Sequence, residues 1–225
     1  MGILKEKRVS VISPKIIACL SQKGGGGKST LARCLAVELT KQKQKHKVLL
    51  VDLDIQQKTS FEWSERRKKI KIEPLINCQV FAYFEKKLLK FDYDYLIIDG
   101  PAKISKESLE IAKVANLVIQ PVRPSLDDLN PAIREFNSLF NAGIPKSKLT
   151  FLINAVGSPA MEKNTRDYLA QTSYYTFPIA LEEKVSYQEA QNQGLSISEV
   201  KYPRLKKQVQ LLVKKIMLAV NQDNS

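Results

Sequence analysis

Cysteine is scarce in this sequence and shows no pairing. The 225 residues contain three cysteines, Cys19, Cys34 and Cys78, which lie far apart and form no Cys-x-x-Cys pair. A disulfide framework uses an even, closely spaced set, and a structural zinc site needs neighbouring ligands. The spacing therefore argues against both, and it fits a reducing cytoplasm.

Long apolar runs are also missing. No window approaches the roughly 18 apolar residues of a membrane-spanning helix, and residues 1–15 carry charges without the apolar stretch of a signal peptide. No Pro-, Gly- or Ser-rich linker, internal repeat or low-complexity tract interrupts the chain. We predict a loose basic lead-in over residues 1–14 and one domain over residues 15–225, and we expect a cytoplasmic protein.

Acidic residues are too few to balance the basic ones. Asp and Glu number 23 against 36 Lys and Arg, which leaves a formal charge of +13, while apolar residues make up 44% and charged residues 26%. The last two values are typical of a folded globular domain rather than a disordered chain. The positive surplus favours a polyanionic partner and says nothing about the fold.

Short apolar runs alternate with amphipathic segments along the chain. The apolar runs are continuous, as in parallel strands that are covered on both faces. This order predicts an α/β fold, an open, mostly parallel twisted sheet with helices on both faces. The predicted strands are Ile16–Leu20, Val48–Asp52, Val80–Phe84, Tyr95–Asp99, Leu117–Val122 and Leu149–Val156. The predicted helices are Lys28–Lys41, Thr59–Lys69, Lys106–Ala115, Asp127–Phe140, Glu162–Ala170, Ser186–Gln193 and Glu199–Val220.

Glycine is rare, with nine in the chain, yet four are consecutive in the segment Lys23-Gly24-Gly25-Gly26-Gly27-Lys28-Ser29-Thr30. The segment joins a predicted strand to a predicted helix, where backbone N–H groups and the helix dipole can hold a phosphate. Lys28 would reach the β and γ phosphates, and the Ser29 hydroxyl would bind Mg²⁺. A flexible glycine-rich connector would not need the lysine and the hydroxyls that follow the glycines.

The motif departs from the ordinary Walker A pattern, because Gln22 stands where glycine is usual and Lys23 adds a second lysine. The segment KGGGGKST resembles the deviant Walker A motif of the ParA/MinD family of P-loop ATPases, and most of all its small plasmid and chromosome partition members. The resemblance implies a P-loop NTPase fold, ATP and Mg²⁺ as ligands, and a homodimer that forms on ATP. It also implies that Lys23 reaches the partner's nucleotide, where a fixed cation offsets charge that develops during transfer.

Carboxylates stand at the ends of two predicted strands. Asp52 and Asp54 share one face of the extended chain at the carboxyl end of a strand, where open α/β sheets bind ligands. The family has Asp-x-Asp-Pro-Gln here, with Ile55 replacing the proline in this chain. The resemblance implies that Asp54 orients the attacking water and that Asp52 supports Mg²⁺. Asp99 ends a hydrophobic strand, as in the Walker B pattern, and would hold a metal-bound water.

Further segments resemble the family less sharply. Asn154, at a predicted strand end, resembles the residue that hydrogen-bonds the adenine, and Pro178 lies in a segment similar to the closing loop of the family. The resemblance implies that both contact ATP. Trp63 resembles a tryptophan of the smaller partition ATPases, although core packing is its simpler role. The resemblance covers about residues 15–218.

The basic residues gather in three segments: the lysines around His46, the stretch from Lys58 to Lys71, and the predicted tail helix. Each could be an ordinary solvated face, but the overall charge favours nucleic acid. No base-reading element is visible, so we expect contacts to phosphates without sequence preference. The candidate DNA-binding residues are Lys201, Arg204, Lys206 and Lys207.

These features predict an ATP-hydrolysing DNA-partition protein with Lys23, Lys28 and Asp54 as catalytic residues. By the resemblance, ATP would assemble a dimer on non-specific DNA at the nucleoid, hydrolysis would release it, and a ParB-like centromere-binding protein would be the activating partner. ATP hydrolysis would then set how long the dimer stays assembled and would not serve to synthesise a product.

Three alternatives stay open. A MinD-like positioning ATPase would anchor to a membrane through the apolar face of the tail helix, although this helix lacks Trp and Phe and we expect it to pack on the sheet. An electron-transfer ATPase of the same superfamily needs paired cysteines that bridge a dimer, whereas Cys19 and Cys34 lie on a predicted strand and a predicted helix of the nucleotide core. A metabolic ligase of the superfamily would not need Lys23 or a basic surface. A DNA-binding protein with an inactive nucleotide site would not need Lys28, Asp54 and Asp99.

Overall fold

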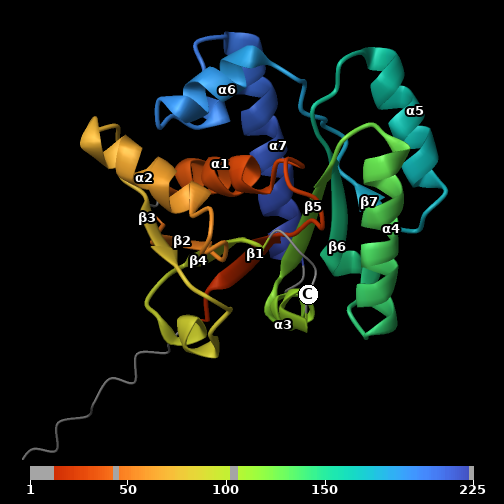
Figure 1. The fold of residues 1–225 in the computed structure, drawn as a ribbon, viewed down its shortest axis with the longest axis horizontal. Helices are drawn as coiled ribbons and strands as arrows, with labels where there is room; N and C mark the ends of the chain where they lie inside the picture. The colour runs from red at the N-terminus through yellow and green to blue at the C-terminus, as the bar shows by residue number, and fades with distance from the viewer. Residues whose placement is uncertain (1–12, 43–45, 102–105, 223–225) are drawn as a thin grey trace, which may run out of the picture.

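The computed structural model describes residues 13–42, 46–101 and 106–222. Strands of these residues form one parallel sheet in the order β3-β2-β4-β1-β5-β6-β7 (Figure 1). The predicted lead-in over residues 1–14 falls outside the described residues, except for Ser13 and Pro14. The strands are β1 Lys15–Cys19, β2 Val48–Asp52, β3 Asn77–Val80, β4 Tyr95–Asp99, β5 Leu117–Val122, β6 Leu149–Ile153 and β7 Tyr175–Thr176.

Helices cover both faces of the sheet, and alternate residues of β1 show why. Ile17 and Cys19 belong to one core with α1, α2, α6 and α7, whereas Ile16 and Ala18 belong to the other core with α3, α4 and α5. The predicted fold class is therefore confirmed. The helices are α1 Lys28–Thr40, α2 Thr59–Lys69, α3 Lys106–Val114, α4 Leu126–Asn141, α5 Pro159–Ala170, α6 Val185–Asn192 and α7 Pro203–Gln222, with short 3₁₀ turns η1 Lys86–Lys90, η2 Lys146–Lys148 and η3 Ile197–Glu199.

The third strand lies earlier than predicted. The sequence predicts Val80–Phe84, but β3 is Asn77–Val80, and Phe81 and Phe84 are half-buried against the core on the face of the sheet that α3 and α4 cover. Because β3 is an edge strand that pairs with β2 alone, it does not need a continuous apolar run. Strand β7 was not predicted, since its two residues are too short and too exposed to give a pattern.

The tail helix begins later than predicted. Residues around Glu199 form the turn η3, in which the Ser196 side chain and the Glu199 carboxylate form a reciprocal capping box. Helix α7 starts at Pro203, which has no N–H to donate and is favoured at a first helical position. The predicted start at Glu199 is therefore wrong by one turn.

The apolar face of α7 is covered by the domain. Its residues lie in the same core as α1, with Val209, Ile216 and Val220 fully buried. The expected packing of this helix on the sheet is confirmed, and the face is not available as a surface anchor. Among the described residues, no helix combines the length and apolar character that crossing a bilayer requires.

Candidate active site

The glycine segment forms a tight loop between β1 and α1. Gly25 and Gly27 have φ angles of 79° and 104°, in the left-handed region that other residues rarely adopt. A Cβ atom on Gly27 would lie 2.3 Å from Nδ2 of Asn154, so the position cannot accept a side chain without rearrangement. Gly27 is also the N-cap of α1 and has no side chain to cap it. The loop therefore leaves backbone N–H groups of the helix start for a ligand.

An open cavity of about 290 Å³ lies over this loop. Its lining combines residues of the phosphate loop with residues at the carboxyl ends of β2 and β4, which are distant in the sequence. Of the predicted catalytic and metal residues, Lys28, Ser29, Asp54 and Asp99 line it. The full lining is Gly24, Gly25, Gly27, Lys28, Ser29, Thr30, Arg33, Asp54, Gln57, Thr59, Asp99 and Gly100.

The two lysines of the motif occupy different surroundings. Lys28 is 8% exposed, and its Nζ donates a hydrogen bond to the carbonyl of Lys23 over 3.3 Å, so its ammonium group is held over the loop. The Lys23 side chain is 44% exposed and pairs with Asp128, with Nζ and Oδ1 3.4 Å apart. Lys23 does not line the cavity of its own chain.

Asp99 is a buried carboxylate with one unused oxygen. Its Oδ2 accepts a hydrogen bond from the Ser60 hydroxyl over 2.6 Å, and its Oδ1 has no hydrogen-bond partner among the described residues. Burial raises the pKa of this carboxyl to about 6, the Ser60 hydrogen bond opposes the rise, and the nearby Asp52 carboxylate adds to it. The unused oxygen is therefore available to a cation or a metal-bound water.

Asp54 lies half-buried at the rim of the cavity. Its Oδ1 accepts hydrogen bonds from the backbone N–H groups of Gln56 and Gln57, over 3.1 and 2.9 Å. These bonds close the turn between β2 and α2 around the carboxylate. Ile55, which replaces the family's proline, is 49% exposed on the same turn.

Asp52 is fully buried and does not line the cavity. Its Oδ1 accepts from the Asp54 N–H over 3.0 Å, and its Oδ2 accepts from the N–H groups of Ser60 and Phe61 over 2.9 and 3.1 Å. A carboxylate at a helix N-terminus stabilises that helix. Asp52 thus fixes the start of α2 beside the cavity, and its support of Mg²⁺ stays a prediction.

The two residues predicted to contact the adenine side lie away from the cavity lining. Asn154 Nδ2 donates to the carbonyl of Gly26 over 2.9 Å, so this side chain braces the phosphate loop. Pro178 is exposed, and its carbonyl accepts from Arg166 over 2.9 Å. Adenine contact by Asn154 and ATP contact by Pro178 both stay predictions.

Sequence reasoning missed a second layer of side chains at this site. Thr59 Oγ1 donates to Ser29 Oγ over 3.3 Å, and Ser60 bridges Asp99 and Arg33. Arg33 lines the cavity although it is only 7% exposed. One signal was present, because Arg33 is a charged residue within an otherwise apolar helix segment.

The cavity suits a magnesium ion that is held mainly by phosphate oxygens. The side-chain donors are hydroxyl and carboxylate oxygens of Ser29, Asp54 and Asp99, the ligand types that Mg²⁺ prefers. No cluster of three or more His, Cys, Asp or Glu that could hold a metal occurs in the described part of the chain. Mg²⁺ typically uses one or two protein groups together with substrate phosphates and water, so the residues present fit this ion.

The predicted DNA-binding residues lie around the start of α7, and all four are exposed. Arg204 is already paired, because its guanidinium donates to both oxygens of Glu182 over 2.5 and 2.8 Å. This fork lowers the pKa of Glu182 to about 2. In the α2 segment, Arg67 is fully buried against Glu199 and does not add to a basic surface. Lys43 and Lys45, beside His46, lie outside the described residues.

The chain resembles a group of nucleotide-binding proteins. The CobQ/CobB/MinD/ParA nucleotide-binding domain model matches residues 17–197. An ATP complex of McdA from Cyanothece is 21% identical, with a TM-score of 0.69, and the match covers 91% of this chain and 97% of that one. A putative plasmid partition protein from Borrelia burgdorferi, bound to AMPPNP, is 19% identical, with a TM-score of 0.66 and coverage of 91% and 98%.

Another similar solved structure is the septum site-determining protein MinD of Pyrococcus horikoshii, complexed with Mg-ADP. It is 18% identical, with a TM-score of 0.68, and the match covers 90% of this chain and 96% of that one. At these identities the solved structures support the fold alone. A search of curated proteins found no match.

Proposed function

Because this chain belongs to the CobQ/CobB/MinD/ParA family of nucleotide-binding domains, we propose that it is a Mg²⁺-dependent ATPase that dimerises on ATP and binds DNA in the dimeric state. One observation carries the ATPase proposal: Lys28, Ser29, Asp54 and Asp99, from three separate strand ends, line one cavity at the N-terminus of α1. A cation, a hydroxyl and two carboxylates that converge around a glycine loop suit the binding of a Mg²⁺–nucleoside triphosphate.

The residues divide the work of phosphoryl transfer. Backbone N–H groups of the glycine loop and Lys28 bind the phosphates and hold the terminal phosphoryl group in place. Ser29 and Asp99 would hold Mg²⁺, which neutralises charge on the phosphate oxygens when bound. Asp54, at the rim, orients the water for in-line attack.

Lys23 supports the dimeric part of the proposal. It is the more exposed lysine of the motif and does not line the cavity of its own chain. A cation on this surface can enter the site of a second copy that faces it, where it offsets negative charge in the transition state. ATP bound in both copies would then stabilise the dimer, and hydrolysis followed by loss of phosphate would weaken it.

DNA binding is proposed for the outer face of α7. Its exposed lysines Lys206, Lys207, Lys214 and Lys215 have no ion-pair partner among the described residues, and the helix contains no Asp or Glu. Arg204 contributes less, because Glu182 already neutralises it. Lysines without acidic partners suit phosphate contacts, which release counterions and need no base sequence. An activating partner such as a ParB-like protein would shorten the life of the bound dimer.

Sedimentation velocity tests the proposal. The purified chain is compared with ADP, with a non-hydrolysable ATP analogue, and with each of them plus plasmid DNA. We expect a monomer with ADP, a dimer with the analogue, and co-sedimentation with DNA only in the analogue sample. A chain that stays monomeric with the analogue contradicts the dimer, and flotation with anionic liposomes in place of DNA binding would favour the MinD-like role.

A further inference from the structure

A row of four hydrogen-bonded side chains runs from the cavity to helix α6. The Ser60 hydroxyl donates to Asp99 Oδ2 over 2.6 Å, and Arg33 Nε donates to the Ser60 oxygen over 3.1 Å. Arg33 Nη1 then donates to Oε1 of Gln191 over 2.6 Å. All four residues are buried, and they come from β4, α2, α1 and α6. The row therefore links four elements through side chains alone.

Arg33 is the unusual member of this row, because its charge is buried without a direct carboxylate partner. Among the described residues it forms no ion pair, and its side-chain hydrogen bonds go to the neutral oxygens of Ser60 and Gln191. Burial lowers its pKa, and the fields of Asp99 and Asp52 oppose that shift. Its guanidinium also lies 5.7 Å from the ring centroid of Trp63. A buried cation of this kind keeps its position only while these directed contacts hold.

The contact with Arg33 fixes the direction of the Ser60 hydroxyl. A hydroxyl has one proton, and when its oxygen accepts from Arg33 Nε, the proton is left to Asp99. Asp99 Oδ2 is then occupied, and Oδ1 is the oxygen without a partner. Loss of the Arg33 contact would let the hydroxyl rotate and would let the carboxylate turn with it.

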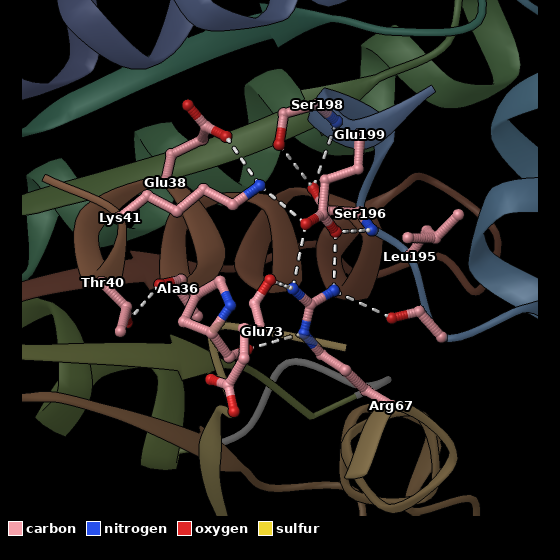
Figure 2. A network of polar contacts seen from close by, with 12 residues as sticks. Ala36, Glu38, Thr40, Lys41, Arg67, Glu73, Leu195, Ser196, Ser198 and Glu199 are labelled. Atoms are coloured by element: carbon pink, nitrogen blue, oxygen red, sulfur yellow. Dashed lines mark hydrogen bonds and ion pairs between the residues drawn. The ribbon is translucent and has the colours of Figure 1, made fainter. Parts of the chain in front are cut away.

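Gln191, which accepts the hydrogen bond from Arg33, is followed by a segment that is itself held in place. The segment after Gln191 is bound by Arg67, which donates to the carbonyl of Gly194 over 3.1 Å and to both oxygens of Glu199 over 2.6 and 2.9 Å. Figure 2 shows the Arg67 guanidinium facing Glu199, with Lys41 on the other side of the same carboxylate. Arg67 also lies 5.7 Å from the Trp63 ring centroid. The end of α6 therefore gives Arg33 a fixed support.

We propose that Arg33 is a positioning residue, which orients Asp99 toward the metal side of the cavity through Ser60 and is itself oriented from α6 by Gln191. The proposal rests on the proposed function, since it gives Asp99 a role with Mg²⁺. It makes the metal contact sensitive to α6, which lies next to η3 and the start of α7. A residue acting through a second residue on a metal ligand typically changes metal affinity about 10- to 100-fold.

The test separates Mg²⁺ binding from nucleotide binding. Affinity for a fluorescent, non-hydrolysable ATP analogue is measured in EDTA and across a Mg²⁺ titration, for wild type, Ser60→Ala, Arg33→Lys and Gln191→Leu. Ser60→Ala and Arg33→Lys are expected to raise the half-saturating Mg²⁺ concentration about tenfold, with less than about a twofold change in EDTA. The Ser60→Ala/Arg33→Lys double variant should match the single ones, because both break the same row. Gln191→Leu should have the same effect in a smaller degree.

Ser64→Ala is the matched control, because Ser64 is a buried serine of α2 whose hydroxyl donates to the Phe61 carbonyl instead of Asp99. It should leave the Mg²⁺ dependence unchanged. Emission of Trp63, the single tryptophan, reports on the nucleotide-free protein and should shift in Arg33→Lys and Gln191→Leu. If Arg33→Lys lowers nucleotide affinity equally with and without Mg²⁺, Arg33 acts only as a cation that attracts phosphate. If Ser60→Ala leaves the Mg²⁺ dependence unchanged, this inference is wrong and the proposed function still stands. A wild-type chain that binds no Mg²⁺–nucleotide would remove the proposed function and this inference together.

Discussion

Lys23 and Asp128 form an ion pair within one chain, with Nζ and Oδ1 3.4 Å apart. Asp128 stands in the first turn of α4, and its other oxygen accepts from the Ser125 hydroxyl over 2.6 Å. In the single chain Lys23 is therefore turned toward α4. In the proposed dimer, Lys23 would have to leave Asp128 to reach the nucleotide of a second copy, so this contact would compete with dimer formation.

Asp128→Asn should strengthen ATP-dependent dimerisation. Exposed ion pairs contribute about 0–1 kcal/mol each, and a symmetric dimer gives up two of them, so the dimer dissociation constant should fall by at most about 30-fold. The measurement is sedimentation velocity over a protein dilution series with a non-hydrolysable ATP analogue. Asp127→Asn removes the same charge from the same turn, next to the pair, and should change little. Equal effects of the two variants would show that net charge, and not release of Lys23, is responsible.

Lys28→Ala should abolish nucleotide binding. In the proposed site, the buried ammonium group would donate charge-assisted hydrogen bonds to two phosphates, each contributing about 1.5–3 kcal/mol, so ATP affinity should fall by roughly 100-fold or more. Binding of a fluorescent ATP analogue measures it. Lys163→Ala, which removes an exposed lysine of α5, should bind as wild type does. Retained affinity in Lys28→Ala would contradict the loop assignment.

Asp54→Ala should bind ATP and persist as a dimer. Positioning and activating the water typically contributes about 10²- to 10⁴-fold in rate, and steady-state phosphate release measures the loss. Because Asp54 Oδ1 also accepts two backbone hydrogen bonds, Asp54→Asn is the sharper variant: it keeps an acceptor for the turn and removes only the charge. If Asp54→Asn turns over normally, the residue serves the turn and not the reaction.

Much of the fold could be predicted from local pattern. Strands β2, β4 and β5 and helix α2 have the bounds that the sequence predicts, because central strands of a parallel sheet must be apolar throughout. The larger errors fall at edge strand β3, at the carboxyl end of β6, which stops at Ile153 instead of Val156, and at the starts of α5 and α7. Edge strand β3 tolerates polar residues, and the start of α7 depends on a capping box that is invisible to hydrophobic periodicity.

Only those site residues that belong to a sequence motif could be predicted. The phosphate loop, Asp54 and Asp99 are adjacent to strand ends, so their convergence follows from parallel topology. The roles of Arg33 and Arg67 could not be predicted, because each depends on a partner far away in the sequence, Gln191 and Glu199 respectively. A charge count assigns Arg67 to a basic surface, whereas tertiary contacts bury it completely.

Glu135 predicts a pH dependence of stability. This glutamate of α4 is 2% exposed, Gln120 donates to its Oε2 over 2.5 Å, and burial raises its pKa from 4.5 to about 7. Between these values the folded chain keeps a proton that the unfolded chain has lost, so this group's contribution falls as pH rises through the window and is lost above about 7. Glu135→Gln should therefore stabilise the fold more at pH 8 than at pH 5, by about 2–3 kcal/mol.

Urea unfolding of both proteins at the two pH values measures this difference. At each pH, the unfolding free energy of wild type is subtracted from that of the variant. This removes the contribution of other titrating groups, provided that the substitution leaves them unaffected. Glu65→Gln, at an exposed glutamate of α2, should give no pH-dependent difference beyond a few tenths of a kcal/mol. A Glu135→Gln variant that is equally affected at both pH values would mean that the carboxyl group does not titrate in this range.

Reversal of Lys206 and Lys207 to Glu should weaken DNA binding and leave ATP affinity unchanged. Each lost phosphate contact removes about 0.9 from the slope of log K against log salt, so the slope should fall by about 2 when fluorescence anisotropy is measured across a salt series with the analogue bound. Lys86→Glu with Lys87→Glu changes the net charge equally at the exposed turn η1 and should lower affinity only through long-range charge. Arg204→Ala should reduce DNA affinity less than the loss of either α7 lysine does, because the Arg204 guanidinium is already paired with Glu182. If the α7 reversal leaves the slope intact, the phosphates are bound elsewhere, and the exposed residues Arg66, Lys68 and Lys69 of α2 become the surface to reverse next.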